Sequence, residues 1–138
     1  MNFIKKLYYE KYVKKSYSIS NVDLIIDRMF SNLDNGIYID VGCNHPIKFN
    51  NTYLLYKRGW KGINIDLDSK SIKEFKKFRP HDYNAQKIVS NDEEEKEIFI
   101  YHERSAINTL SKELVDYRKT KPKKIFKEKS TTLNKIIE

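Results

Sequence analysis

One stretch decides the fold of this chain: Gly36-Ile-Tyr-Ile-Asp-Val-Gly-Cys-Asn-His-Pro46. Its apolar residues from Ile37 to Val41 predict a strand that is covered on both faces, as in a parallel sheet. Asp40 stands near the end of this strand, where a buried carboxylate needs a partner. Gly42 then allows a tight turn or a close approach of the backbone to another group. We therefore interpret the stretch as a buried strand followed by a sharp turn.

A second predicted strand, Gly62-Ile-Asn-Ile-Asp66, also ends in an acid. Between the strands, the cap-type residues from Asn50 to Thr52 precede an apolar segment, and Gly59 ends it. This spacing fits one strand–helix–strand unit of roughly 30 residues with parallel strands. A glycine turn after the first strand and an acid closing the second are typical of a nucleotide-type cofactor site.

The composition predicts one α/β domain, 36–138, preceded by an N-terminal helical segment, 1–35. The 138 residues carry a net charge of +8, and lysines occur throughout the chain. A solvated basic surface is the favoured interpretation, and an anionic partner such as nucleic acid or a membrane surface is the alternative. Cys43 is the single cysteine, so we expect a reducing, cytoplasmic setting. No apolar run approaches the ~18 residues of a membrane span.

Hydrophobic periodicity predicts the helices. Residues 1–18 form a basic amphipathic helix that covers a neighbouring surface of the same domain, with a membrane surface as the alternative. In a second predicted helix, Leu24, Ile25, Met29 and Phe30 recur at helical spacing. Another runs from about Ser69 to Phe78.

The C-terminal half is predicted with fewer signals. A third strand runs roughly from Tyr83 to Val89, and the short segment from Ile98 to Tyr101 pairs antiparallel with it. Residues 112–129 are rich in lysine and form a solvated helix or loop. A last amphipathic helix begins near Leu133.

Asp66 is the predicted ligand of a ribose, because a carboxylate at the end of the second strand accepts hydrogen bonds from both hydroxyls. A cap for the next helix is the alternative role. The turn holds only Gly42 of the G-x-G-x-x-G pattern, which argues against a pyrophosphate. S-adenosylmethionine fits better, since it joins an adenosine to a charged amino-acid tail without phosphates. Asp40 balances the ammonium or sulfonium of that tail, directly or through water.

The remaining candidate is His45, the nearest possible proton acceptor for an alcohol; a ligand or a turn residue is the alternative, and the turn residue has at least equal weight. The three histidines lack metal-ligand spacing, so no metal site is predicted. Cys43 is expected to be a small packing residue rather than a nucleophile.

Several short sequence motifs follow one another along the chain: the Gly36 stretch, Asn51-Thr-Tyr, Leu55-Tyr-Lys-Arg-Gly-Trp-Lys-Gly-Ile-Asn-Ile-Asp66, Phe78-Arg-Pro-His-Asp-Tyr-Asn84, Ile88-Val-Ser90 and Ala106-Ile-Asn-Thr-Leu110. In these motifs the chain resembles the FkbM-type S-adenosylmethionine-dependent methyltransferases. The resemblance implies a partial Rossmann-like class I methyltransferase fold, mostly a parallel sheet with an antiparallel segment and N-terminal helices. It implies cofactor contacts at Asp40, Gly42, Asn44 and Asp66, with Val89 or Ser90 near the adenine. It also implies a carbohydrate or another small metabolite as the methyl acceptor.

The chain departs from the family pattern in two places. Relatives often carry Ser-Gln-x-Gly-Glu-Asp before the second helix, where this chain has Ser18-Ile-Ser-Asn-Val-Asp23. The family also continues after the last helix into a strand ending Asp-x-Glu-Gly, whereas this sequence ends at Glu138. Without that strand the Ile37 to Val41 strand has an exposed edge. We expect a second polypeptide, a homodimer or the basic N-terminal helix to cover it, or the chain to be a fragment.

Three functions follow in order of preference. The first is a methyltransferase, or the cofactor-binding half of one. The second is a catalytically inactive half-domain that serves as a binding or assembly module. The third is a nucleic-acid binder, which we place last because no nucleic-acid motif is visible.

Overall fold

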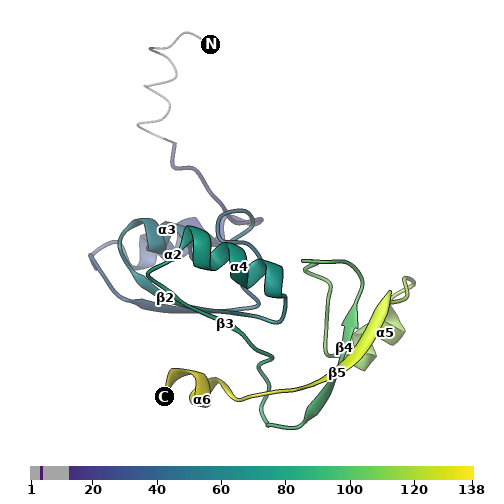
Figure 1. Cartoon of the computed structure of the whole chain (residues 1–138). Coiled ribbons are helices and arrows are strands. Elements are labelled where there is room, and N and C mark those ends of the chain that lie inside the picture. The colour runs from purple at the N-terminus through teal and green to yellow at the C-terminus, as the bar shows by residue number, and fades with distance from the viewer. Residues whose placement is uncertain (1–3, 5–12) are drawn as a thin grey trace.

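The computed structural model describes Ile4 and residues 13–138 (Figure 1). This part of the chain is α/β, with a three-stranded parallel sheet and a two-stranded antiparallel sheet. In chain order the elements are α2 (Val22–Met29), β1 (Ile37–Val41), α3 (Tyr53–Lys57), β2 (Lys61–Asp66), α4 (Ser69–Phe78), β3 (Tyr83–Gln86), β4 (Glu95–Ile100), α5 (Lys112–Tyr117), β5 (Lys124–Lys129) and α6 (Leu133–Ile137).

The parallel sheet has the strand order β1-β2-β3. Ile37 lies opposite Lys61 and Ile63 opposite Tyr83, so the strands are in close register. Figure 1 shows α2, α3 and α4 on one side of this sheet. The two parallel strands and the helix from Ser69 to Phe78 confirm the sequence prediction. β3 is shorter than predicted and ends at Gln86.

Two small apolar clusters hold the helices on the sheet. Tyr38, Leu55 and Trp60 form one cluster between β1, α3 and the start of β2. Cys43 packs with Ile72 and Phe75 of α4 in the other. Burial raises the pKa of the Cys43 thiol, and the nearby carboxylates of Asp66 and Asp40 raise it further. The thiol is therefore protonated and serves as packing.

Three predictions for the ends of the chain were wrong in whole or in part. The segment near Ile98 belongs to β4, which pairs antiparallel with β5 and not with β3. Of the solvated helix or loop predicted over 112–129, α5 is a helix as predicted, but residues 124–129 form the strand β5. Its lysines face the acids of β4, with Glu95 opposite Lys129 and Glu97 opposite Lys127, and opposite charges across strands stabilise a ladder. Of the helix predicted over 1–18, residues 13–18 are not helical, and most of the rest lies outside the described residues.

A fully buried arginine, Arg79, joins β1, α3 and α4 on the face of the sheet that the helices cover. It follows α4 directly, and its Nε donates to the carbonyl oxygen of Pro46 at 3.0 Å. The two other nitrogens donate to the side chains of Tyr38 (3.0 Å), Thr52 (2.9 Å) and Asn50 (2.7 Å). The guanidinium also lies beside aromatic rings, with Phe75 at 4.9 Å from its central carbon. One side chain thus binds the end of α4, the β1 strand and the loop that leads into α3.

The positive charge of Arg79 is balanced through intermediate side chains. The Tyr38 hydroxyl donates to Asp82 at 2.6 Å, and the Thr52 hydroxyl donates to Asp40 at 2.9 Å. Burial raises the pKa of Tyr38, so its hydroxyl stays protonated and links Arg79 to Asp82. The charge and the two carboxylates therefore form one connected network.

We expect Arg79→Met to lower the free energy of unfolding by about 3–5 kcal/mol, because it leaves buried acceptors and carboxylates without their cation. Chemical denaturation followed by circular dichroism measures this loss. Lys77→Met, on the exposed side of α4, is the matched control and should stay within about 0.5 kcal/mol of the original chain. A loss below about 1 kcal/mol for Arg79→Met would contradict the role of the network.

Gly62 gives a second test, because a Cβ at this position would lie 2.4 Å from the Tyr38 ring. Hydrogen bonds to Arg79 and Asp82 hold that ring in place. We expect Gly62→Ala to cost about 1–3 kcal/mol of stability. In a Tyr38→Leu background the same change should cost much less, which a double-mutant cycle measures. Equal costs in both backgrounds would mean that the ring is not the obstacle.

Candidate functional site

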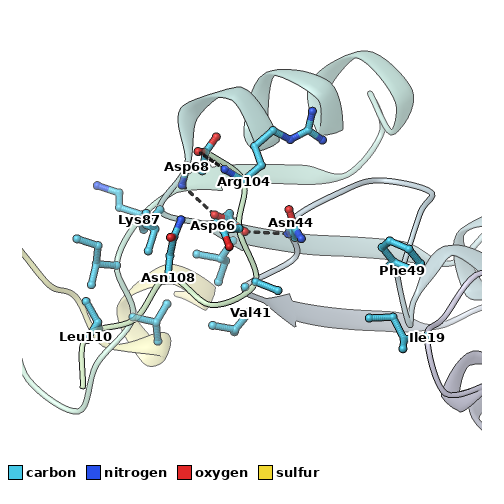
Figure 2. A pocket seen from close by; sticks show the side chains of 17 residues that line it. Ile19, Val41, Asn44, Phe49, Asp66, Asp68, Lys87, Arg104, Asn108 and Leu110 are labelled. Carbon is cyan, nitrogen blue, oxygen red and sulfur yellow. Dashed lines mark hydrogen bonds between the residues drawn. The ribbon is translucent and has the colours of Figure 1, made fainter. Parts of the chain in front are cut away.

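A cavity of about 340 Å³ lies at the carboxyl ends of the parallel strands (Figure 2). The end of β1 contributes Val41, Gly42 and Asn44, and the end of β2 contributes Ile65 to Asp68. The rest of the wall comes from the segment after β3, from the loop around Arg104 to Leu110, and from Ile19 and Phe49. In open α/β sheets this edge is where ligands bind.

The turn after β1 is closed onto β2 by its own backbone. Gly42 has a φ of 74° and Asn44 a φ of 53°, so the chain turns through the left-handed region twice. The N–H groups of Gly42 and Cys43 both donate to the carbonyl oxygen of Ile65, at 2.8 and 3.2 Å. The N–H of Asn44 donates to the Asp66 carboxylate at 2.8 Å. These donors are already used, so the turn does not offer a nest of free N–H groups to a phosphate.

Asp66 is the central acid of the cavity (Figure 2). One carboxylate oxygen accepts the N–H of Asn44, and the other accepts the N–H of Asp68 at 2.8 Å. Burial raises the pKa of Asp66, and these two N–H donors oppose the rise. Each oxygen has a second lone pair for a ligand hydroxyl. The alternative role of helix cap belongs instead to Asp68, which accepts from the N–H groups of Lys70 and Ser71.

A loop between β4 and α5 forms the outer wall and is fastened to α4. Arg104 makes two hydrogen bonds of 2.7 Å to the carboxylate of Glu74. Its backbone N–H donates to Asp68 at 3.2 Å. Asn108 stabilises the loop internally, because its side-chain oxygen accepts a hydrogen bond from the N–H of Tyr101. The loop is thus a fixed wall of the cavity.

The structure brings together four of the predicted cofactor residues: Gly42, Asn44, Asp66 and Val89 all line the cavity. Ser90 does not line it. Its N–H donates to the carbonyl oxygen of Thr131 at 3.0 Å, which joins the segment after β3 to the start of α6.

Asp40 also lies outside the lining and has partners of its own. Its carboxylate accepts from Asn50 Nδ2 at 3.0 Å and from Thr52 Oγ1 at 2.9 Å. These are the cap-type residues before α3, and both are buried. Asp40 therefore belongs to the Arg79 network behind the cavity.

His45 forms a turn next to the cavity and is not among its lining residues. Its Nδ1 accepts from the N–H groups of Ile47 and Lys48, each at 3.0 Å. Burial lowers the pKa of His45, although the carboxylate of Glu74 opposes this. The ring is therefore neutral near pH 7. It stabilises the turn, which is the structural role given above as the alternative to a proton acceptor.

Sequence reasoning missed the acids and the arginine that fasten the loop. Asp68 had a usable signal, because an Asp immediately before a helical pattern is a common N-cap. Arg104 and Glu74 had none, since they are far apart in the sequence and either one alone resembles an ordinary surface charge.

Comparisons of the sequence with protein-family models, with curated proteins and with solved structures gave no match. No helix in the described part of the chain is long and apolar enough to cross a membrane. Among the same residues, no group of three or more His, Cys, Asp or Glu side chains is placed to hold a metal ion.

The Arg104–Glu74 pair should make stability depend on pH. Hydrogen bonds from Arg104 lower the pKa of Glu74 in the folded chain below its ordinary value of 4.5. The pair therefore stabilises the fold fully above about pH 4.5, and the effect is lost as pH falls through the lower folded value. We expect Glu74→Gln to cost about 0.5–1 kcal/mol at pH 7, since the pair is partly exposed.

Urea unfolding at several pH values measures this difference, which should shrink as the pH falls below about 4.5. Glu113→Gln, at an exposed position of α5, is the control and should change stability by only a few tenths of a kcal/mol. A cost for Glu74→Gln that is constant down to pH 3 would show that the ionised pair does not fasten the loop.

Proposed function

We propose that this chain binds S-adenosylmethionine in the cavity and is an FkbM-type methyltransferase with a partial Rossmann-like class I fold. The observation that carries the proposal is the position of Asp66. Its carboxylate lies in the cavity at the end of β2, beside a glycine turn at the end of β1. A nucleoside ribose presents two hydroxyl donors, and a carboxylate with free lone pairs is a suitable partner for both.

The turn supports a cofactor without phosphates. A pyrophosphate needs several free backbone N–H groups at the end of the first strand. Here the N–H groups of Gly42, Cys43 and Asn44 all donate to the end of β2. The lining holds two acids, Asp66 and Asp68, and two cations, Lys87 and Arg104, so the argument against a phosphate comes from the turn and not from the charge of the cavity. An adenosine that carries an amino-acid tail needs no free N–H groups at this turn.

Each part of such a cofactor has residues of suitable chemistry nearby. Asp66 holds the ribose, and the apolar side chains of Ile88 and Val89 form a wall for the adenine. The side chain of Asn44 and the backbone at Gly42 border the amino-acid tail. Asp40 acts on this region indirectly, because it lies outside the lining and one of its oxygens accepts from both Asn50 and Thr52.

S-adenosylmethionine supplies an activated methyl group when it is bound. The contribution of the chain is to hold the cofactor and an acceptor hydroxyl in line and to limit the access of water. The acceptor proton must pass to a base or to solvent during transfer. The acceptor class, a carbohydrate or another small metabolite, comes from the family resemblance alone.

A second function, a catalytically inactive half-domain that acts as a binding or assembly module, is favoured by one observation. The β1 strand forms an open edge of the sheet within the described part of the chain. A module of this kind would keep the cavity and transfer no methyl group.

Calorimetric titration of the purified chain with S-adenosylhomocysteine tests the cofactor site. We expect micromolar binding and a loss of at least about tenfold in affinity for Asp66→Ala, since a buried hydrogen bond to a charged group is worth about 1.5–3 kcal/mol. Asp116→Ala, on exposed α5, is the control and should bind normally. NAD should bind more weakly than S-adenosylhomocysteine. A folded chain that binds neither compound, or that prefers NAD, would contradict the proposal.

Radiolabelled methyl transfer from S-adenosylmethionine to a panel of sugars and small alcohols then separates the two functions. Transfer to any acceptor, abolished by Asp66→Ala, supports the methyltransferase. Cofactor binding without any transfer across the panel favours the inactive module.

A further inference from the structure

The loop that joins α5 to β5 concentrates positive charge. Five of the seven residues from Arg118 to Lys124 are Lys or Arg, and none of the seven is acidic. We call residues 118–124 the basic loop. All four of its lysines are exposed: Lys119, Lys121, Lys123 and Lys124. In Figure 1 the loop lies at the side of the antiparallel sheet that is turned away from the parallel sheet.

No carboxylate of the described chain forms an ion pair with a lysine of the basic loop. On the flanking elements, Lys112 pairs with Asp116, and Lys127 pairs with Glu95. The other lysines that form ion pairs among the described residues belong to other segments. The charge of the basic loop is therefore available to an anionic partner.

The basic loop is fastened at both ends, so its lysines stand on a defined surface. Arg118 donates from its side chain to the carbonyl oxygen of Ile107, and its guanidinium carbon lies 5.3 Å from the centre of the Tyr101 ring. At the other end, the N–H of Lys123 donates to the carbonyl oxygen of Ile100 at 2.7 Å. The anchors belong to β4 and to the loop that follows it, which forms the outer wall of the cavity.

Exposed apolar side chains stand beside the basic loop. Tyr117 is 88% exposed, Leu114 45% and Ile107 41%. Tyr117 and Ile107 line one hollow together with Arg118 and Lys119, so apolar and cationic side chains share a face. Leu114 precedes Tyr117 by three residues in α5, which places both on the same side of the helix.

This combination fits the surface of a membrane that contains anionic lipids. Clustered lysines attract the headgroups, and apolar side chains beside them reach the boundary with the acyl chains. A tyrosine suits that boundary, because its ring is apolar and its hydroxyl meets water. A nucleic acid would use the charge and could stack a base on Tyr117, but it offers no apolar layer to Leu114 and Ile107.

We propose that the basic loop, with Leu114, Tyr117 and Ile107 beside it, docks the chain reversibly on a membrane of anionic lipids. The lysines supply the attraction to the headgroups, and the apolar side chains supply the contact with the lipid. This interaction goes beyond the proposed function and does not depend on it, and the test below uses no cofactor.

Co-sedimentation with vesicles measures the docking, with phosphatidylcholine alone and with phosphatidylcholine mixed with phosphatidylserine. At about 0.15 M salt the chain should bind the mixed vesicles at least about tenfold more tightly than the neutral ones. The loop variant, Lys119→Gln with Lys121→Gln and Lys123→Gln, should lose at least about tenfold of this affinity, because each lysine near the anionic surface adds to the attraction. Equal binding to the two kinds of vesicle overturns the proposal.

A matched variant on α4 removes the same charge from another exposed surface: Lys73→Gln with Lys76→Gln and Lys77→Gln. It should bind the mixed vesicles within about twofold of the original chain, since salt screens charges that do not face the membrane. A loss as large as that of the loop variant would mean that net charge directs the binding, and it overturns the basic loop as the docking site. Circular dichroism checks that each variant is folded, as expected for exposed lysines.

Leu114→Ser separates a membrane from a nucleic acid, because an aliphatic side chain gains free energy only where it leaves water. It should weaken binding to the mixed vesicles about threefold or more and leave binding to a single-stranded oligonucleotide unchanged. Vesicle binding that Leu114→Ser does not affect, or oligonucleotide binding without vesicle binding, overturns the membrane as the partner.

Discussion

The buried guanidinium of Arg79 is the constraint on which the rest of the structure depends. A charge without water must find hydrogen-bond partners, and Arg79 finds them in β1, in the loop before α3 and in the carbonyl oxygen of Pro46. These segments meet only when α4 lies on the sheet. The cost of leaving the charge unpartnered therefore makes the helix, the loop and the strand form together.

The network also sets the shape of the candidate site. Because Arg79 fixes both Asn50 and Pro46, the loop between β1 and α3 has little freedom, and the turn at Gly42 is pressed against β2. The turn donates its N–H groups within the fold, so the polar groups offered to the cavity are side chains such as Asp66, Lys87 and Asn108. The proposed ligand, a nucleoside without phosphates, needs no free N–H groups at this turn.

The sequence predicted the parts of the fold whose signals are local. The strand at Ile37, the glycine turn and the acid at Asp66 could be predicted, because an apolar run, a Gly and an acid at a strand end are signals that depend only on neighbouring residues. β5 was missed because half of its residues are lysines, and its partner acids lie about thirty residues earlier, beyond the reach of local patterns. Arg79 was missed because arginine is almost always a surface residue, and only the assembled structure shows the acceptors that allow its burial.

The burial of Cys43 affects how the chain responds to oxidants and thiol reagents. Its thiol is buried between β1 and α4, and burial raises its pKa, so the reactive thiolate is scarce. Peroxide, disulfides and alkylating reagents act on the thiolate and need access to it. We therefore expect these reagents to react slowly at the turn that carries Gly42 and Asn44, so that the wall of the cavity beside it keeps its shape.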